Sequence, residues 1–173
     1  MATYEQVAIG VHGVLTENPC SEPSQALAKA RKRLQETPEL LNKAIQFLRE
    51  RGTHPDPEVI GALSQMRLAE WVHLKDLKSG AILLDIEGHE AYCVAGLTQS
   101  PGEIIGSRGW IVETALCPFA GVILCGGIFL ARCQLGPDLR RRFNERYLSL
   151  KAAGRLHRRP DTAPLWESTR SWR

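Results

Sequence analysis

The stretch TALCPFAGVILCGGIFLA, residues 114–131, separates a membrane protein from a protein with a buried core, because it runs for eighteen residues without a charged side chain. A run of this length just reaches what a transmembrane helix needs. Pro118, Gly121, Gly126 and Gly127 interrupt it, although a lone helix in lipid must keep its own backbone hydrogen bonds. We therefore interpret the run as a buried hairpin. A membrane-attached protein with residues 114–131 as its span is the first alternative.

The expected hairpin pairs residues 110–116 with residues 122–131 around a turn at residues 118–121. The second of these segments is rich in good strand formers. Gly126 and Gly127 then predict a bulge or bend within a long strand. An apolar run without alternation also implies a strand that is covered on both faces.

Helices are expected before the hairpin. Their signals are a capping pattern at Thr3, Pro23 in a first turn, Thr37 as a cap with Gly52 past the end, and Asp56 before a proline. The fourth helix either runs to about residue 74 or gives way to a strand around residue 71. From residue 78 onward glycines become frequent and apolar runs become short, so strands 81–86 and 90–95 are expected around a turn at residues 87–89.

We therefore expect an α+β protein. Its N-terminal helices precede a small antiparallel β-sheet or partly closed barrel, and a C-terminal helix follows. The expected parts are a helical region at 1–77, an antiparallel β-meander at 78–135, a basic C-terminal helix at 136–159 and a flexible tail at 160–173. A chain of 173 residues with 43% hydrophobic and 24% charged residues fits one globular domain, or one domain with an appendage.

The five cysteines indicate a reducing compartment. Their number is odd, no N-x-S/T glycosylation acceptor occurs, and the first residues lack the basic region of a secretory signal. We expect a cytoplasmic protein with free thiols and no cofactor. Cys117, Cys125 and Cys133 recur every eight residues. This spacing lacks the close pair of cysteines that a zinc site uses, and it would place Cys117 opposite Cys125 across the turn.

Positive charge gathers at the C-terminal end of the chain. Residues 140–173 hold ten Lys/Arg and three Asp/Glu, whereas residues 1–139 hold twelve and sixteen, so the net charge of +3 divides into +7 and −4. Such asymmetry favours a non-catalytic binding or adaptor module for an acidic macromolecule, nucleic acid among the candidates. The predicted binding residues are Arg140, Arg141, Arg142, Arg146, Lys151, Arg155, Arg158 and Arg159.

The second alternative is a small metal- or thiol-dependent enzyme. It would centre on Asp85, His89 and Cys93, which lie in or near the sequence DIEGHE. Carboxylates beside a histidine can bind a metal or exchange protons, but polar residues also fill ordinary turns. The glycine-rich segment 96–109 has neither the lysine nor the strand–helix frame of a phosphate-binding loop.

Overall fold

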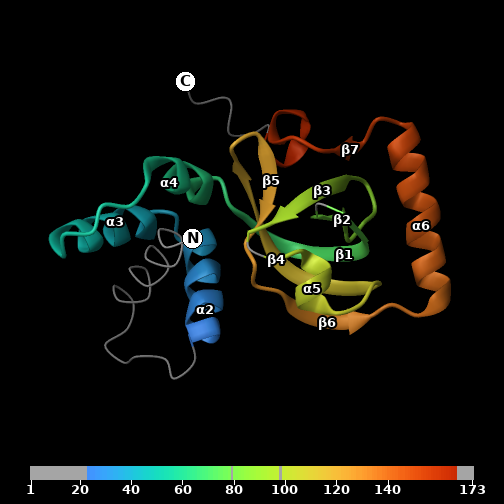
Figure 1. The fold of residues 1–173 in the computed structure, drawn as a ribbon, viewed down its shortest axis with the longest axis horizontal. Helices are drawn as coiled ribbons and strands as arrows, with labels where there is room; N and C mark the ends of the chain where they lie inside the picture. The colour runs from blue at the N-terminus through green and yellow to red at the C-terminus, as the bar shows by residue number, and fades with distance from the viewer. Residues whose placement is uncertain (1–22, 79, 98, 167–173) are drawn as a thin grey trace. The chain divides into compact units, whose positions relative to one another are not determined.

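The computed structural model describes residues 23–78, 80–97 and 99–166 (Figure 1). The helix expected after Thr3 lies outside these residues. The chain divides into two compact units, residues 1–68 and residues 69–173. Unit 2 carries the sheet and residues 140–159, which we call the basic segment.

Three helices make up the described part of unit 1. They are α2 (Pro23–Glu36), α3 (Leu40–Glu50) and α4 (Pro57–Ser64). The expected start of α4 is confirmed, because the side chain of Asp56 accepts a hydrogen bond from the backbone N–H of Glu58 at 2.8 Å. Helix α3 begins later than expected, with Glu39 at its N-cap in place of Thr37. The buried apolar stripe of α3 supplies half of the buried hydrophobic residues that the structure describes in this unit.

Unit 2 is built on a closed barrel of five strands. The bounds of the strands are β1 Arg67–Leu77, β2 Gly80–Asp85, β3 Ala91–Gly96, β4 Trp110–Phe119, β5 Val122–Cys125, β6 Leu130–Gln134 and β7 Leu156–His157. The barrel order is β1-β2-β3-β5-β4, and a pairing between β4 and β1 closes it. Strand β6 pairs with β4, and β7 pairs with β3.

The expected α+β class is therefore confirmed, but the expected antiparallel pairing is only partly correct. Strand β3 runs parallel to β5 and to β7, so the sheet is mixed. The sheet begins earlier than expected, at Arg67. Of the two possibilities for the residues up to about 74, a longer fourth helix or a strand, the structure has the strand β1. With helix α5 (Pro101–Ile105) between β3 and β4, the strand order is that of the OB-type Greek-key barrel.

Residues 114–131 contain the expected hairpin, but its turn is shorter than expected, because Pro118 and Phe119 belong to β4. Strands β4 and β5 pair in antiparallel register from Leu116–Cys125 to Phe119–Val122. Ala120 and Gly121 join them with φ angles of 48° and 77°, the positive values that a two-residue hairpin turn requires. No helix within the described ranges is long and apolar enough to cross a membrane.

The expected bulge is also present. After Cys125 the chain leaves the ladder and then pairs with β4 again as β6. The backbone N–H of Gly126 donates to the carbonyl of Ala115 at 2.9 Å, and the buried hydroxyl of Thr114 donates to the carbonyl of Ile128 at 2.8 Å. These bonds hold the irregular segment against β4, so β5 and β6 act as two parts of one interrupted strand.

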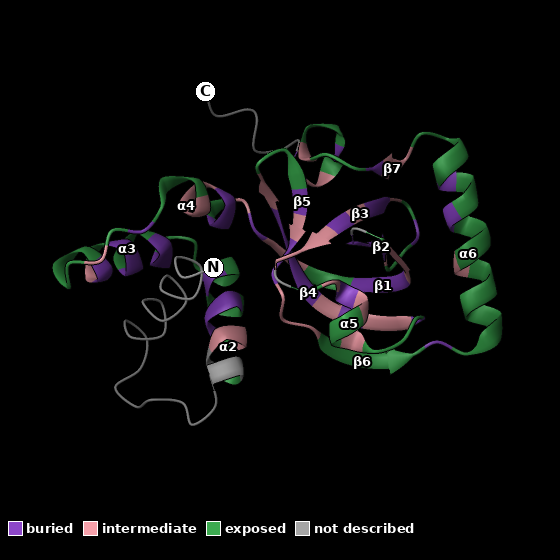
Figure 2. Cartoon of the chain, viewed as in Figure 1, coloured by how far each residue is buried: buried purple, intermediate pink, exposed green. Residues whose placement is uncertain are grey.

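Two apolar clusters form the core of unit 2 (Figure 2). The inner cluster fills the barrel and includes Trp71, Leu83, Tyr92 and Ile123. The outer cluster lies between the outer face of β1–β3 and helix α6 (Pro137–Ala152), and its buried residues are Val72, Leu74, Ile82, Leu84, Ala91, Leu135, Tyr147 and Leu150. Strands β1 and β2 are thus covered on both faces.

The C-terminal segment differs from the expected long helix and flexible tail. Helix α6 ends at Ala152, and β7 and a 3₁₀ turn, η1 (Pro160–Thr162), follow it. Ala163 and Trp166 are buried in the inner cluster. Part of the basic segment therefore pairs with β3 as β7 and does not extend the helix.

Candidate functional site

Helix α6 determines where most of the basic side chains lie. Successive residues turn by about 100° around an α-helix, and Phe143, Tyr147 and Leu150 mark the face that packs on the barrel. Arg140, Asn144 and Lys151 then share one flank of the helix, which we call the first flank. Arg142 and Arg146 lie on the opposite flank.

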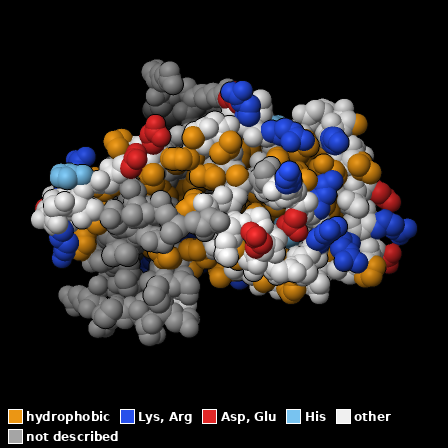
Figure 3. Space-filling view, viewed as in Figure 1, with side chains coloured by type: hydrophobic (Ala, Val, Ile, Leu, Met, Phe, Trp, Pro, Cys, Tyr) orange, Lys and Arg blue, Asp and Glu red, His pale blue; other side chains and the backbone are white. Residues whose placement is uncertain are grey.

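The side of α6 that points away from the barrel is not the basic one. It carries Arg141, Glu145 and Leu148, all exposed. Leu148 is 61% exposed, because the helical rotation of about 100° per residue turns it away from the face of Phe143, Tyr147 and Leu150. The positive charge borders the two edges where α6 meets the barrel, and Figure 3 shows Lys and Arg side chains gathered around this part of the surface.

Four of the eight predicted binding residues are engaged within unit 2. The Nε of Arg146 donates to the carbonyl of Gly88 at 2.6 Å, which ties α6 to the β2–β3 turn. Arg155 pairs with Glu90. Arg141 pairs with Asp138 at 3.3 Å and Arg159 with Asp161 at 3.2 Å, and all four of these side chains are largely exposed. Exposed pairs of this kind contribute little to stability.

The other four predicted residues are Arg140, Arg142, Lys151 and Arg158. All four are exposed, and none pairs with a carboxylate in the part of the chain that the structure describes. Their guanidinium and ammonium groups are therefore available to an acidic ligand.

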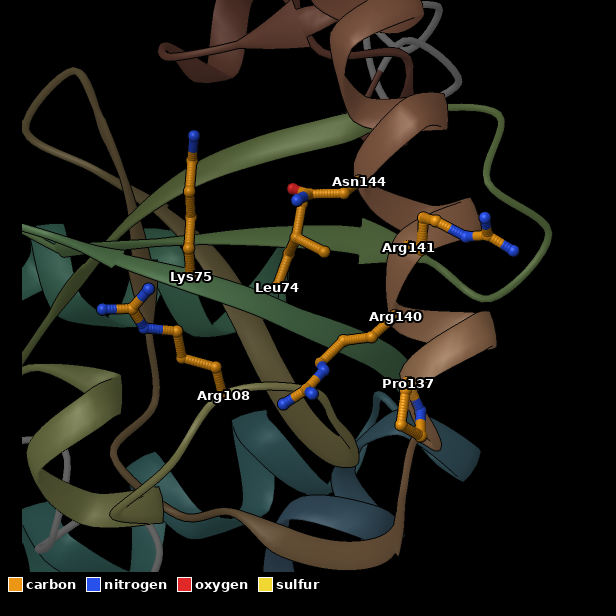
Figure 4. Close-up of a pocket in the computed structure, with 7 residues that line it drawn as sticks. All are labelled: Leu74, Lys75, Arg108, Pro137, Arg140, Arg141 and Asn144. Atoms are coloured by element: carbon orange, nitrogen blue, oxygen red, sulfur yellow. The ribbon is translucent and has the colours of Figure 1, made fainter.

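A hollow of about 510 Å³ lies beside the first flank of α6 (Figure 4). Its lining consists of Leu74, Lys75, Arg108, Pro137, Arg140, Arg141 and Asn144. Four of these side chains are cations, and no carboxylate lines the hollow. The hollow is thus a strongly positive concavity.

Sequence reasoning missed Lys75 and Arg108. Lys75 follows a bulge in β1, where the register with β2 shifts between His73 and Lys75. Arg108 comes from the glycine-rich segment 96–109, which lacks the lysine of a phosphate-binding loop but contains this one arginine. Only the closure of the barrel brings these two cations to α6. The presence of Arg108 in that glycine-rich segment was the one feature of the sequence that could have indicated a further anion-binding cation.

A second cluster of charges links the β2–β3 turn to β7. The carboxylate of Glu90 accepts hydrogen bonds from Nε of Arg155 at 2.9 Å and from Nε2 of His157 at 2.7 Å. Burial alone would raise the pKa of Glu90, but these two hydrogen bonds outweigh it and hold the pKa below its ordinary value. The cluster fixes the end of the basic segment to the barrel.

An aromatic chain continues inward from this cluster. The ring of His157 lies 5.5 Å from that of Tyr92, and Tyr92 meets Trp71 edge to face at 5.3 Å. Burial, with the negative charge of Glu90 as a further cause, raises the pKa of Tyr92 well above its ordinary value. The Tyr92 side chain is thus a neutral part of the core.

The proposed enzyme centre has a structural explanation for each of its members. Asp85 accepts hydrogen bonds from the backbone N–H groups of His89 and Glu90, at 2.7 and 3.0 Å, and so shapes the turn. The exposed ring of His89 lies 3.1 Å from the carboxylate of Glu87. Cys93 packs at the edge of the outer cluster. The expected hairpin is confirmed, but its polar residues serve the turn.

The cysteines do not share one face of the sheet. Cys117 lies opposite Leu124, and Cys125 lies opposite Leu116, so the expected pairing of Cys117 with Cys125 is wrong. Cys125 points into the inner cluster, as does Leu116, the neighbour of Cys117. Because side chains alternate along a strand, Cys117 points outward. Among the described residues, no group of three or more His, Cys, Asp or Glu side chains could hold a metal ion.

The outer face of strands β2 and β3 is closed to ligands. In OB-type barrels this face binds oligonucleotides or oligosaccharides. Here α6 covers it, and Ile82, Leu84 and Ala91 are buried beneath the helix. The part of the sheet beneath α6 is therefore not open to a ligand.

Comparison with known protein families, with curated protein sequences and with solved structures finds no match to the chain.

Proposed function

We propose that this protein is a nucleic-acid-binding module that holds the phosphate backbone along the first flank of α6. The single observation that carries the proposal is the hollow, which four cations line without a carboxylate. Nucleic-acid backbones are the acidic polymers that such cations bind most generally, and this binding depends little on sequence.

The arrangement of the flank supports the same reading. Arg140 lines the hollow, and Lys151 lies about three helical turns further along the same side of α6. Lys75 and Arg108 extend the positive surface onto the barrel. A stripe of this kind can contact successive phosphates of one strand.

The charge asymmetry of the chain gives the third support. Surface cations add little to stability, so packing alone does not explain the +7 charge of residues 140–173. The outer sheet face offers no aromatic stacking surface, because α6 covers it. We therefore expect binding that is dominated by electrostatics, tolerant of sequence and sensitive to salt.

A double variant tests the proposal. Arg140→Ala/Lys151→Ala removes two cations of the first flank, and Lys43→Ala/Arg49→Ala removes two exposed cations of α3 as a matched control. Fluorescence anisotropy with labelled RNA and DNA strands at low and high salt gives the affinity and its salt dependence. The flank variant should weaken binding, and the slope of log K against log salt should become shallower by about 0.7–0.9 for each phosphate that the variant no longer neutralises.

The control variant should bind as the wild type does, apart from a small general effect of net charge. Equal affinities for the flank variant and the control, or no binding of either nucleic acid by the wild type, contradict the proposal. Anionic lipid vesicles form a separate arm of the experiment. Salt-sensitive binding to vesicles without binding to nucleic acid assigns the basic surface to a membrane instead.

A further inference from the structure

The hollow beside α6 has the features of a site for one compact, highly charged anion. Its cations come from three separate segments, with Lys75 on β1, Arg108 in the loop before β4, and Arg140 and Arg141 on α6. Cations from separate segments can reach one ligand from more than one side, whereas cations along an exposed helix face contact it from one side only. The first turn of α6, marked by Pro137, also borders the hollow. The positive end of the helix dipole adds to the attraction for an anion.

Packing directs Arg140 toward the loop that carries Arg108. The aliphatic part of Arg140 lies on the backbone of Gly109, where an added Cβ would come within 2.6 Å of its Cδ atom. Figure 4 shows Arg140 extending from α6 toward this loop, whereas Arg141 points away from it. Neither Arg108 nor Arg140 has a hydrogen-bond or ion-pair partner among the described residues. Two guanidinium groups are thus available to one ligand.

Lys75 is placed by the outer cluster. Its ammonium group lies 4.2 Å from the centre of the Tyr147 ring, an attractive cation–π distance. Leu74 and Pro137 supply the apolar part of the lining, and Asn144 supplies an amide. The hollow, at about 510 Å³, therefore offers room for a phosphate together with the group that carries it.

The number of cations distinguishes between kinds of phosphate. A phosphodiester within a strand carries one negative charge, whereas a phosphate monoester carries about −1.5 to −2 at neutral pH and presents three acceptor oxygens. Arginine forks match these oxygens in a bidentate way. Three lining cations that have no carboxylate partner among the described residues, Lys75, Arg108 and Arg140, favour a monoester over a diester, because the attraction grows with the charge of the ligand.

We propose that the hollow binds a phosphate monoester, such as the phosphorylated end of a nucleic-acid strand. That the monoester is the end of a nucleic-acid strand rests on the function proposed above. The monoester site itself can be tested without assuming that function. In this arrangement Arg108 and Arg140 hold the terminal phosphate, Lys75 adds charge, and Lys151 meets the strand further along the first flank.

The test compares strands that differ only at their ends. Oligonucleotides of one sequence carry a 5′-phosphate, a 3′-phosphate or hydroxyl groups at both ends, and fluorescence anisotropy measures their affinities. The wild type should bind one phosphorylated form at least about tenfold more tightly than the hydroxyl form. Arg108→Ala and Arg140→Ala should each abolish most of this preference.

Arg142→Ala is the matched control, because Arg142 is an exposed cation on the opposite flank of α6. It should leave the preference for the phosphorylated strand unchanged, whatever it does to overall affinity. The preference should also shrink as pH falls through about 6, where the monoester gains a proton. Thermal unfolding of each variant confirms that the fold is retained.

A second arm uses adenosine 5′-monophosphate and adenosine as probes in calorimetry. If the wild type binds the monophosphate more tightly than adenosine, and Arg140→Ala abolishes this preference, the monoester site is supported. If the same preference is found but no strand binds, only the proposed nucleic-acid function is overturned. Equal binding of phosphorylated and hydroxyl strands, together with no preference for the monophosphate, overturns the monoester site. In that case strand binding by the wild type would leave the function proposed above intact.

Discussion

The carboxylate of Glu90 lies 2.7 Å from Nε2 of His157, a residue 67 positions further along the chain. Glu90 ends the β2–β3 turn, and His157 lies on β7, which pairs in parallel with β3. The contact therefore fastens the last part of the basic segment to the barrel. Arg155 shares the same carboxylate, so one acidic residue holds two cationic side chains in place.

Replacement of Glu90 by Gln should make stability depend less on pH. The hydrogen bonds hold the pKa of Glu90 below its ordinary value near 4.5. The stabilisation by its charge is therefore fully present above about pH 4.5 and is lost as pH falls through the lower pKa of the folded state. At neutral pH the variant should lose roughly 1–3 kcal/mol of unfolding free energy, and its difference from the wild type should shrink in acid.

Urea unfolding at several pH values measures this difference. Glu87→Gln is the control, because Glu87 lies in the same turn, and its side chain is 75% exposed and pairs only with His89 among the described residues. It should change stability by less than about 0.5 kcal/mol. A loss for Glu90→Gln that stays constant from neutral to acidic pH contradicts the electrostatic role of Glu90.

Neighbouring residues of β5 should lose very different amounts of stability on truncation. Ile123 points into the barrel and is fully buried, whereas Val122 is 41% exposed. Ile123→Ala leaves a cavity in the inner cluster and should cost about 2–5 kcal/mol. Val122→Ala should cost much less, because less of its apolar surface is buried. Chemical denaturation of both variants checks the assignment of the inner face, and similar losses for the two would show that it is wrong.

Two leucines of α6 provide a matched test of how the helix packs. Leu150 is 3% exposed and belongs to the outer cluster, whereas Leu148 is 61% exposed. Leu150→Ala should cost about 2–5 kcal/mol of stability, and Leu148→Ala should stay within about 0.5 kcal/mol of the wild type. Thermal melting distinguishes the two. A large loss for Leu148→Ala would mean that its side of α6 is covered.

The cysteines should react with a thiol reagent in an order set by burial. Cys133 is exposed, Cys93 is half-buried, and Cys117 and Cys125 are buried, all as free thiols. Native protein should be labelled first at Cys133 and more slowly at Cys93, and the two buried thiols should react only after denaturation. Mass spectrometry of peptides after timed alkylation follows each site. Early labelling of Cys125 would contradict the closed barrel.

Much of the fold follows from local signals in the sequence. The glycines of residues 114–131 predicted a hairpin turn and a bulge or bend; Ala120-Gly121 form the turn, and strand pairing is interrupted at Gly126, whereas Pro118 lies in β4. Asp56 predicted the start of α4 correctly. These features could be predicted from the sequence, because a turn, a cap or a helix breaker acts on residues close to it in the chain.

Which strands pair with one another could not be predicted from such local signals. A meander is the simplest arrangement of consecutive strands, but β5 pairs in parallel with β3, and β4 returns to β1 to close the barrel.

For the candidate site, the sequence alone shows the excess of positive charge near the C-terminus and predicts a helix that carries much of it. Folding engages some of those cations, such as Arg146 and Arg155, and leaves others available, such as Arg140. It also brought Lys75 and Arg108 to the same hollow. The physical reason is that charge is a property of composition, whereas a concave site depends on contacts between segments far apart in the chain.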